Sequence, residues 1–318
     1  MPASNRFRDA LAESRRRGAQ TIERWRRAPA SAALAEHFAG LPADDPVAAT
    51  RRAESLLRGA DWAAELLAPL IEALREDPLF EPPFKVSRDR FRTGAVLFDH
   101  PAVSISACLS RAEALRTAPP AATVLFSGRL SVTRYVEAGG ARLRRWITDP
   151  VPPDAGDTML PTCREMPDVC LRDGEVRTLD GRSEAQLVVS PATDMMTLVA
   201  TIRAGVAPLM REHRIVDGAA VRLASADDRA SRAEMLLAFL GRAGRSDAGD
   251  RFEAATRDPA FHLRWAAMRE WLALDARAAL PRLEAMARDD PHGQVRAAAA
   301  ATIGRVRARI DQAARCPG

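Results

Sequence analysis

The stretch DPAFHLR, residues 258–264, recurs as DPHGQVR at residues 290–296, one period of 32 residues later. Both copies begin with Asp-Pro and end with an arginine six positions after the aspartate. One period upstream of Arg264, Arg232 occupies the same arginine position. Repeats of about 20–50 residues are typical of stacked helical units, each too small to bury its own apolar face. The repeat therefore predicts an array of helical pairs in the C-terminal third.

The spacing of aspartate and arginine in these two stretches is similar to that of HEAT repeats. This resemblance implies helical pairs that bind a protein or peptide on a concave face. The first unit departs from the pattern, because Ala226 stands at the matching aspartate position with Asp227 beside it. The pairing of aspartate and arginine in the first unit is therefore left open.

The periodic arginines Arg232, Arg264 and Arg296 have two interpretations. As an aligned basic stripe, they are candidate partner-binding residues for phosphate or a carboxylate-rich peptide. In the structural interpretation, each arginine pairs with an aspartate and locks adjacent units together. The six-residue spacing to an aspartate favours the structural interpretation.

The middle of the chain predicts β-strands. Residues 103–106 and 130–133 alternate between apolar and polar side chains, as half-buried strands do. Turn signals follow at Gly139-Gly140, Asp173-Gly174, Asp180-Gly181 and Asp217-Gly218, and each predicts a hairpin. Many short strands with regular turns favour an antiparallel barrel or sandwich.

The order of these strands and turns resembles a cupin-like β-barrel. The resemblance rests on residues 123–128, 129–136, 143–147 and 170–182. Together with the repeats, the whole chain resembles uncharacterised bacterial proteins that place a cupin-like domain before HEAT repeats. The expected fold class is α+β, with N-terminal helices, a central antiparallel cupin-like β-barrel and C-terminal HEAT-type α-repeats.

A pocket in such a barrel would be lined by inward-facing strand residues. The candidate ligand-binding residues are Tyr135, Arg145, Trp146 and His213. Because side chains alternate along a strand, Arg134 and Tyr135 cannot both point inward. The alternative for Tyr135 is a core position with a satisfied hydroxyl group.

The sequence predicts no metal, no cofactor and no catalytic residue. A metal-binding cupin needs clustered histidines, whereas this region has only His100 and His213. An irregular site of Cys163, Cys170, Glu212 and His213 is the alternative. No phosphate-binding loop, nucleophile elbow or paired-cysteine zinc motif is present in the sequence.

The N-terminal segment predicts helices. Phe7, Leu11, Ile22 and Trp25 share one helix face, while six arginines between residues 15 and 27 crowd the rest. We expect Pro29 to end this helix, and its apolar face to dock near Trp62 and Leu66. A second helix follows, which Pro69 should kink or split. The arginines either stay solvated or bind an anionic surface.

The 318 residues carry a formal net charge of +5, and both ends of the chain are mildly basic. This charge permits weak nucleic-acid binding. The chain shows neither a secretory signal nor a stretch apolar enough to cross a membrane, and its cysteines lack CxxC spacing, so a cytoplasmic location is expected.

Three segments are predicted: N-terminal helices over 1–83, the barrel over 84–225 and the helical repeats over 226–318. The preferred function is a non-catalytic interaction, scaffold or regulatory protein that binds a protein or peptide partner. The first alternative is a cupin-type enzyme, or a peptide-modification accessory protein, that works without histidine. The second alternative is nucleic-acid binding through the basic ends.

Overall fold

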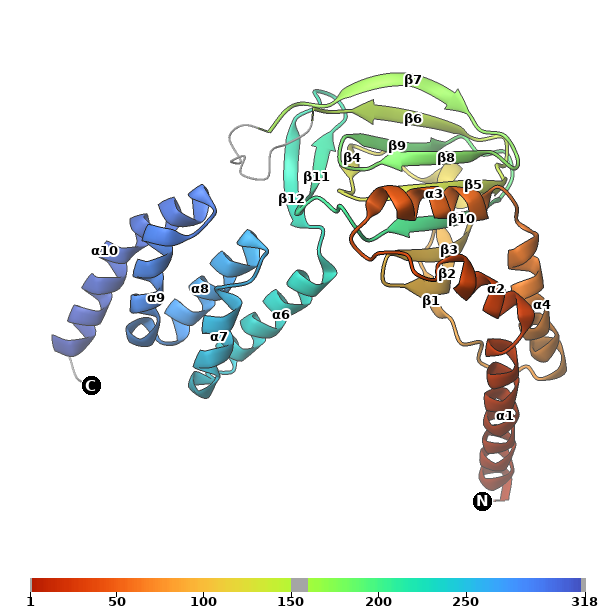
Figure 1. Ribbon diagram of the computed structural model, residues 1–318, viewed down its shortest axis with the longest axis horizontal. Coiled ribbons are helices and arrows are strands. Elements are labelled where there is room, and N and C mark those ends of the chain that lie inside the picture. The colour runs from red at the N-terminus through yellow and green to blue at the C-terminus, as the bar shows by residue number, and fades with distance from the viewer. Residues whose placement is uncertain (1, 150–159, 316–318) are drawn as a thin grey trace. The chain divides into compact units, whose positions relative to one another are not determined.

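The computed structural model describes residues 2–149 and 160–315 and divides the chain into two compact units (Figure 1). The first, here called the sheet unit, comprises the chain through Thr148 together with Cys163–Val206 and Arg214–Gly218. The second, here called the helical unit, contains Ala207–His213 and the chain from Ala219 onward. Each unit is described by itself.

The sheet unit begins with four helices. They are α1 (Pro2–Arg26), α2 (Pro29–His37), α3 (Pro46–Leu57) and α4 (Asp61–Glu76). As expected, the first helix stops before Pro29, which opens α2. Asp45 caps α3 by accepting hydrogen bonds from the N–H groups of Val47 and Ala48 at 3.0 and 2.9 Å. Helix α4 contains Pro69 but is not split there, so the chain stays helical through to Glu76.

Apart from β4, the strands of the sheet unit form two antiparallel sheets. The six-stranded sheet has the order β1-β2-β3-β10-β5-β8, and a three-stranded sheet has the order β7-β6-β9. The strands are β1 (Lys85–Arg88), β2 (Arg92–His100), β3 (Val103–Ser110), β4 (Thr123–Phe126), β5 (Leu130–Glu137), β6 (Arg142–Ile147), β7 (Arg164–Cys170), β8 (Val176–Asp180), β9 (Glu184–Val189) and β10 (Met195–Ile202), with the short helix α5 (Ala112–Thr117) after β3. The predicted antiparallel β region between helical ends is confirmed.

Three of the four predicted hairpins are wrong. At Gly139-Gly140, both glycines have positive φ, 60° and 64°, yet the turn leads from β5 in one sheet to β6 in the other. The turns at Asp173-Gly174 and Asp180-Gly181 also carry the chain between the two sheets. Only Asp217-Gly218 joins strands that pair with each other, β11 (Leu209–Arg214) and β12 (Ala220–Ser225). A tight turn constrains the local chain direction, whereas partner choice depends on strands far away in sequence.

One core cluster holds the N-terminal helices against the six-stranded sheet. Leu34, Phe38 and Leu57 from the helices pack with Ile105 and Leu198 from the strands, all nearly fully buried. Helix α3 packs across β5, β8 and β10 (Figure 1). The predicted segment 1–83 therefore shares its core with the strands that follow it.

Helix α1 docks where the sequence predicted. Its Trp25 indole N–H donates to the carbonyl oxygen of Leu66 at 2.8 Å, and its ring meets Phe84 edge-on at 5.6 Å. Gly18 lies against Phe80, because a Cβ at this glycine would be 3.2 Å from that ring. The arginines of α1 from Arg15 to Arg26 are exposed, as is Arg27 just after the helix.

A second layer of core lies between the two sheets. Tyr135 and Met195 of the six-stranded sheet pack with Leu143 of the three-stranded sheet. Nearby, Phe126 of β4 and Trp146 of β6 form another buried cluster. The sheets are thus joined by apolar side chains on the face opposite to the helices.

The helical unit contains stacked helices after the β11–β12 hairpin. They are α6 (Asp228–Arg242), the short 3-10 turn η2 (Ser246–Ala248), α7 (Gly249–Ala255), α8 (Phe261–Leu274), α9 (Ala276–Asp289) and α10 (Gly293–Arg315). Helix α8 packs against α6 and α10, and α7 packs against α9. We call α6, α8 and α10 the first helices of three consecutive units, and α7 and α9 the second helices of the first two units. The predicted C-terminal helices are confirmed.

The docking of α1 generates a stability prediction. We expect Trp25→Ala to lower the free energy of unfolding by about 2 kcal/mol, because a half-buried indole and its hydrogen bond to Leu66 are lost. Arg24→Ala, an exposed neighbour on α1, should change it by less than about 0.5 kcal/mol. Urea unfolding of the full chain measures both variants. Equal stabilities would contradict the docking.

Candidate binding surface

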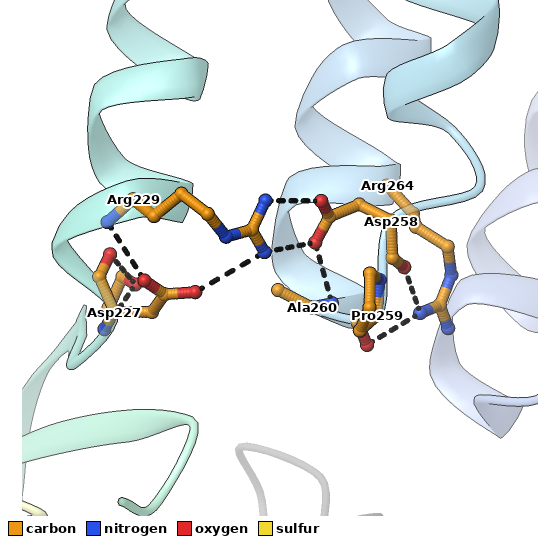
Figure 2. A network of polar contacts seen from close by, with 7 residues as sticks. Asp227, Arg229, Asp258, Pro259, Ala260 and Arg264 are labelled. Carbon is orange, nitrogen blue, oxygen red and sulfur yellow. Dashed lines mark hydrogen bonds and ion pairs between the residues drawn. The ribbon is translucent and has the colours of Figure 1, made fainter. Parts of the chain in front are cut away.

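Each unit of the helical array is opened by one aspartate. The side chains of Asp227, Asp258 and Asp290 each accept a hydrogen bond from the backbone N–H of the residue two positions later. Figure 2 shows the first two of these contacts. The donors are Arg229, Ala260 and His292, at 2.8, 2.9 and 2.9 Å. Asp227, and not the position of Ala226, therefore begins the first unit.

Arg264 links the second unit to the third. Its Nη1 donates to the carbonyl oxygens of Asp258 and Pro259, at 3.0 and 3.1 Å, in the loop before its own helix (Figure 2). Its Nε and Nη2 donate to the two carboxylate oxygens of Asp290, at 2.8 and 2.6 Å. Arg264 and Asp290 are only 5% and 4% exposed. The structural interpretation of the repeat is therefore supported for this arginine.

The other two periodic arginines behave differently. Arg296 donates to the carbonyl oxygen of Asp290 at 2.5 Å, which repeats the contact of Arg264 with its own loop. Arg232 is exposed and makes neither a hydrogen bond nor an ion pair with any described residue. The contact to the second unit comes from Arg229, which binds both carboxylate oxygens of Asp258 at 2.7 and 3.0 Å (Figure 2).

The reason is a difference of one residue in spacing. Arg232 follows Asp227 by five residues, whereas Arg264 follows Asp258 by six. Because one residue turns an α-helix by about 100°, Arg232 does not occupy the position equivalent to that of Arg264. The three arginines therefore do not form one aligned basic stripe.

The surrounding groups lower the pKa of two of these carboxylates, those of Asp258 and Asp290. For Asp290, burial alone would raise the pKa, but hydrogen bonds from Arg264 and the N–H of His292, with the charges of Arg264 and Arg282, lower it overall. For Asp258, the hydrogen bond from Arg229 is the main cause of a lowered pKa. A buried, paired carboxylate becomes costly when its partner is removed.

We expect Arg264→Ala to lower the free energy of unfolding by about 3–5 kcal/mol, since it leaves the Asp290 carboxylate buried without its partner. Arg232→Ala is the matched control, one period upstream, and should change stability by less than about 0.5 kcal/mol. Chemical denaturation of both variants is the measurement. A similar loss for both would contradict the assigned roles.

A groove runs between the first helices of the three units, and we call it the first-helix groove. Its volume is about 320 Å³. Phe261 and Trp265 supply aromatic walls, while Glu234 and Arg269 place opposite charges along it. It is also lined by Leu209, His262, Ala266, Gln294, Val295 and Ala298. This mixture of apolar walls and a few polar groups is typical of a binding site.

His262 is the polar group with unusual surroundings in this groove. Both of its ring nitrogens are buried and neither has a hydrogen-bond partner among the described residues. Burial lowers its pKa, against the charges of Glu234, Asp227 and Asp258, which raise it, while Arg264 adds to the lowering. The imidazole is therefore held neutral near pH 7.

The lowered pKa of His262 predicts a pH dependence. The unfolded imidazole titrates near 6.5, so below that pH the unfolded chain binds more protons than the folded one. The free energy of unfolding should fall as the pH decreases from 6.5 toward the folded pKa. Urea unfolding at pH 7.5 and 5.5 tests this, with His262→Leu as the control that should lose less stability. An equal loss in both chains would contradict it.

The four predicted ligand-binding residues are not gathered into one described pocket. Tyr135 and Trp146 lie in two separate buried clusters between the sheets. Arg145 is half-buried and 3.9 Å from Glu184. His213 belongs to β11 in the helical unit and is fully buried. As predicted, Arg134 and Tyr135 face opposite ways.

The side chains on the two faces of β5 have different structural roles. Arg134 donates to the carbonyl oxygens of Leu57 and Arg58 at 3.2 and 2.7 Å, which caps the end of α3. On the other face, burial raises the pKa of Tyr135, and its hydroxyl meets the amide of Gln186 at 3.5 Å. Tyr135 therefore has the surroundings of a core residue.

Sequence reasoning missed the first-helix groove. Its α8 residues His262, Trp265 and Arg269 follow each other at steps of three and four, so their shared face was visible in the sequence. The spacing alone does not show whether this face lines a groove or packs in the core, because tryptophan occurs in both places. The groove is revealed only when α6 and α10 are placed on either side.

Within 2–149 and 160–315, no group of three or more His, Cys, Asp or Glu side chains is placed to hold a metal ion. Cys108, Cys163 and Cys170 are free thiols. In the same part of the chain, no helix combines the length and apolar character needed to cross a membrane.

Comparison with known proteins leaves the family open. No protein-family model matches the chain, and no curated protein matches it. Among solved structures, it is similar to an iron(II) form of HppE, at 13% identity and a TM-score of 0.24, over 38% of this chain and 56% of that one. The chain thus spans little more than half of that structure.

Two further structures show likenesses of the same order. One is of DMSP lyases, at 16% identity and a TM-score of 0.27, over 64% of this chain and 97% of that one. The other is a sugar phosphate isomerase of the cupin superfamily from Silicibacter pomeroyi, at 12% identity and a TM-score of 0.23, over 44% and 85%. Likenesses at these TM-scores assign neither a fold nor an activity.

Proposed function

We propose that this chain is a non-catalytic interaction protein whose helical unit holds a segment of a partner protein in the first-helix groove. The observation that carries the proposal is the groove itself, with aromatic walls at Phe261 and Trp265 and opposite charges at Glu234 and Arg269. A volume of about 320 Å³ suits one or two large side chains of a peptide better than a whole cofactor.

The proposal moves the partner site away from Arg264 and Arg296. Both arginines donate hydrogen bonds to loop carbonyl groups, and Arg264 also donates to the Asp290 carboxylate. These contacts support a role in stacking the units, as in HEAT repeats. The strands that alternate between two sheets support a cupin-like barrel as the companion unit. A cytoplasmic location completes the proposal.

The alternatives stay predictions. An enzyme that works without histidine would need an open, polar site, and Tyr135 and Trp146 lie instead among apolar side chains. Nucleic-acid binding would use the exposed arginines of α1 and α10. Most of these arginines have no described aromatic side chain beside them on which a base could stack.

Selection from a phage-displayed library of random 12-residue peptides against the full chain tests the proposed function. We expect enriched peptides that bind the unaltered chain and lose at least about 10-fold in affinity on Trp265→Ser, because the aromatic wall is removed. Arg296→Gln, outside the groove lining, is the matched control and should bind the same peptides. The proposal fails if no peptide is enriched, or if every enriched peptide binds Trp265→Ser unchanged.

A further inference from the structure

The first helix of the array exposes an apolar face, here called the outer face of α6. Met235, Leu236 and Phe239 lie on it at 67%, 63% and 66% exposure. They follow each other at steps of one, three and four, so they form one stripe along the helix. The buried residues of α6, Ala230 and Leu237, lie on another side of the helix.

The next unit shows what such a face normally meets. Counted from Asp227 and Asp258, Met235 and Leu236 correspond to Ala266 and Ala267 of α8, which are buried. Phe239 corresponds to Glu270, and a Cβ added to Gly241 of α6 would lie 2.9 Å from Oε2 of Glu270. In α8, this face therefore packs against the preceding first helix. In α6, the same face is open.

We propose that the outer face of α6 is the docking site for an acidic amphipathic helix of a partner protein. This deepens the proposed function, since it names a second surface of the helical unit and the kind of partner it takes. A helix is the expected occupant because the equivalent faces of the array receive helices. Terminal units of such arrays ordinarily carry a polar outer face, whereas three large apolar side chains mark an interaction site.

The charges beside the stripe define the partner further. Arg232 and Arg242 lie toward its two ends, both exposed and neither in an ion pair with a described residue. The acid of α6 nearest the stripe in sequence, Glu234, lines the first-helix groove instead. A helix with leucine-like residues on one side and carboxylates at its margins would satisfy both the apolar stripe and the arginines.

A second copy of the chain fits less well. Stacked head to tail, it would bring the exposed Arg305 and Arg309 of its α10 toward Arg232 and Arg242, and like charges would repel. Stacked by a two-fold axis, it would set the two α6 helices antiparallel and duplicate the same arginines. A separate acidic helix meets neither difficulty.

The test uses a labelled 18-residue helical peptide with leucine on one face and glutamate elsewhere, and measures fluorescence anisotropy with the full chain. A version with lysine in place of glutamate is the charge control. We expect the acidic peptide to bind at least about 10-fold more tightly than the lysine peptide. Leu236→Ser with Phe239→Ser should weaken binding at least about 10-fold, as should Arg232→Glu with Arg242→Glu.

Two controls separate this proposal from the groove. Trp265→Ser should leave binding of the acidic peptide unchanged, so a failure here and a failure of the groove are told apart. Thermal melting should be unchanged by Leu236→Ser with Phe239→Ser, because both side chains are exposed. Equal binding of both peptides, no binding, a lowered melting temperature, or a dimer that this double variant dissociates would each overturn the proposal.

Discussion

The buried ion pair between Arg264 and Asp290 is the contact on which the helical unit depends. It joins the first turn of α8 to the loop that precedes α10, so it constrains the distance and rotation between consecutive units. The same guanidinium also holds the carbonyl oxygens at the start of its own helix. The Arg264 side chain therefore contacts both the start of its own helix, α8, and the loop that places α10. Because α8 and α10 both line the first-helix groove, this contact also affects the width of the groove.

In the sheet unit, the comparable constraint is the two-sided use of the six-stranded sheet. One face carries the N-terminal helices, with Arg134 capping the end of α3, while the other face packs on the three-stranded sheet through Tyr135 and Met195. A strand covered on both faces leaves little room for polar side chains. That arrangement explains why the aromatic residues of β5 and β6, Tyr135 and Trp146, lie in buried clusters.

The sequence predicted those parts of the fold that rest on local or strictly periodic signals. The Asp-Arg spacing predicted stacked helical pairs, and the apolar stripe of α1 predicted its docking near Leu66. Sequence analysis failed where a small change in spacing turns a side chain to another face of its helix. Because Arg232 follows Asp227 by five residues and Arg264 follows Asp258 by six, Arg232 is exposed while Arg264 is buried. It failed again at Gly139-Gly140, where the turn was visible but the strand partners were not.

The position of β10 in the six-stranded sheet has a consequence for synthesis of the chain. This strand lies between β3 and β5, although β3 ends at Ser110 and β10 begins only at Met195. At a translation rate of about 5–20 residues per second, β3 leaves the ribosome on the order of 4–17 seconds before its partner exists. During that interval the edge of β3 is an unpaired template for any other extended chain. The helices α2 to α4 are already made and can cover one face of β3, but the hydrogen-bonding groups at its edge stay unpaired until β10 is made.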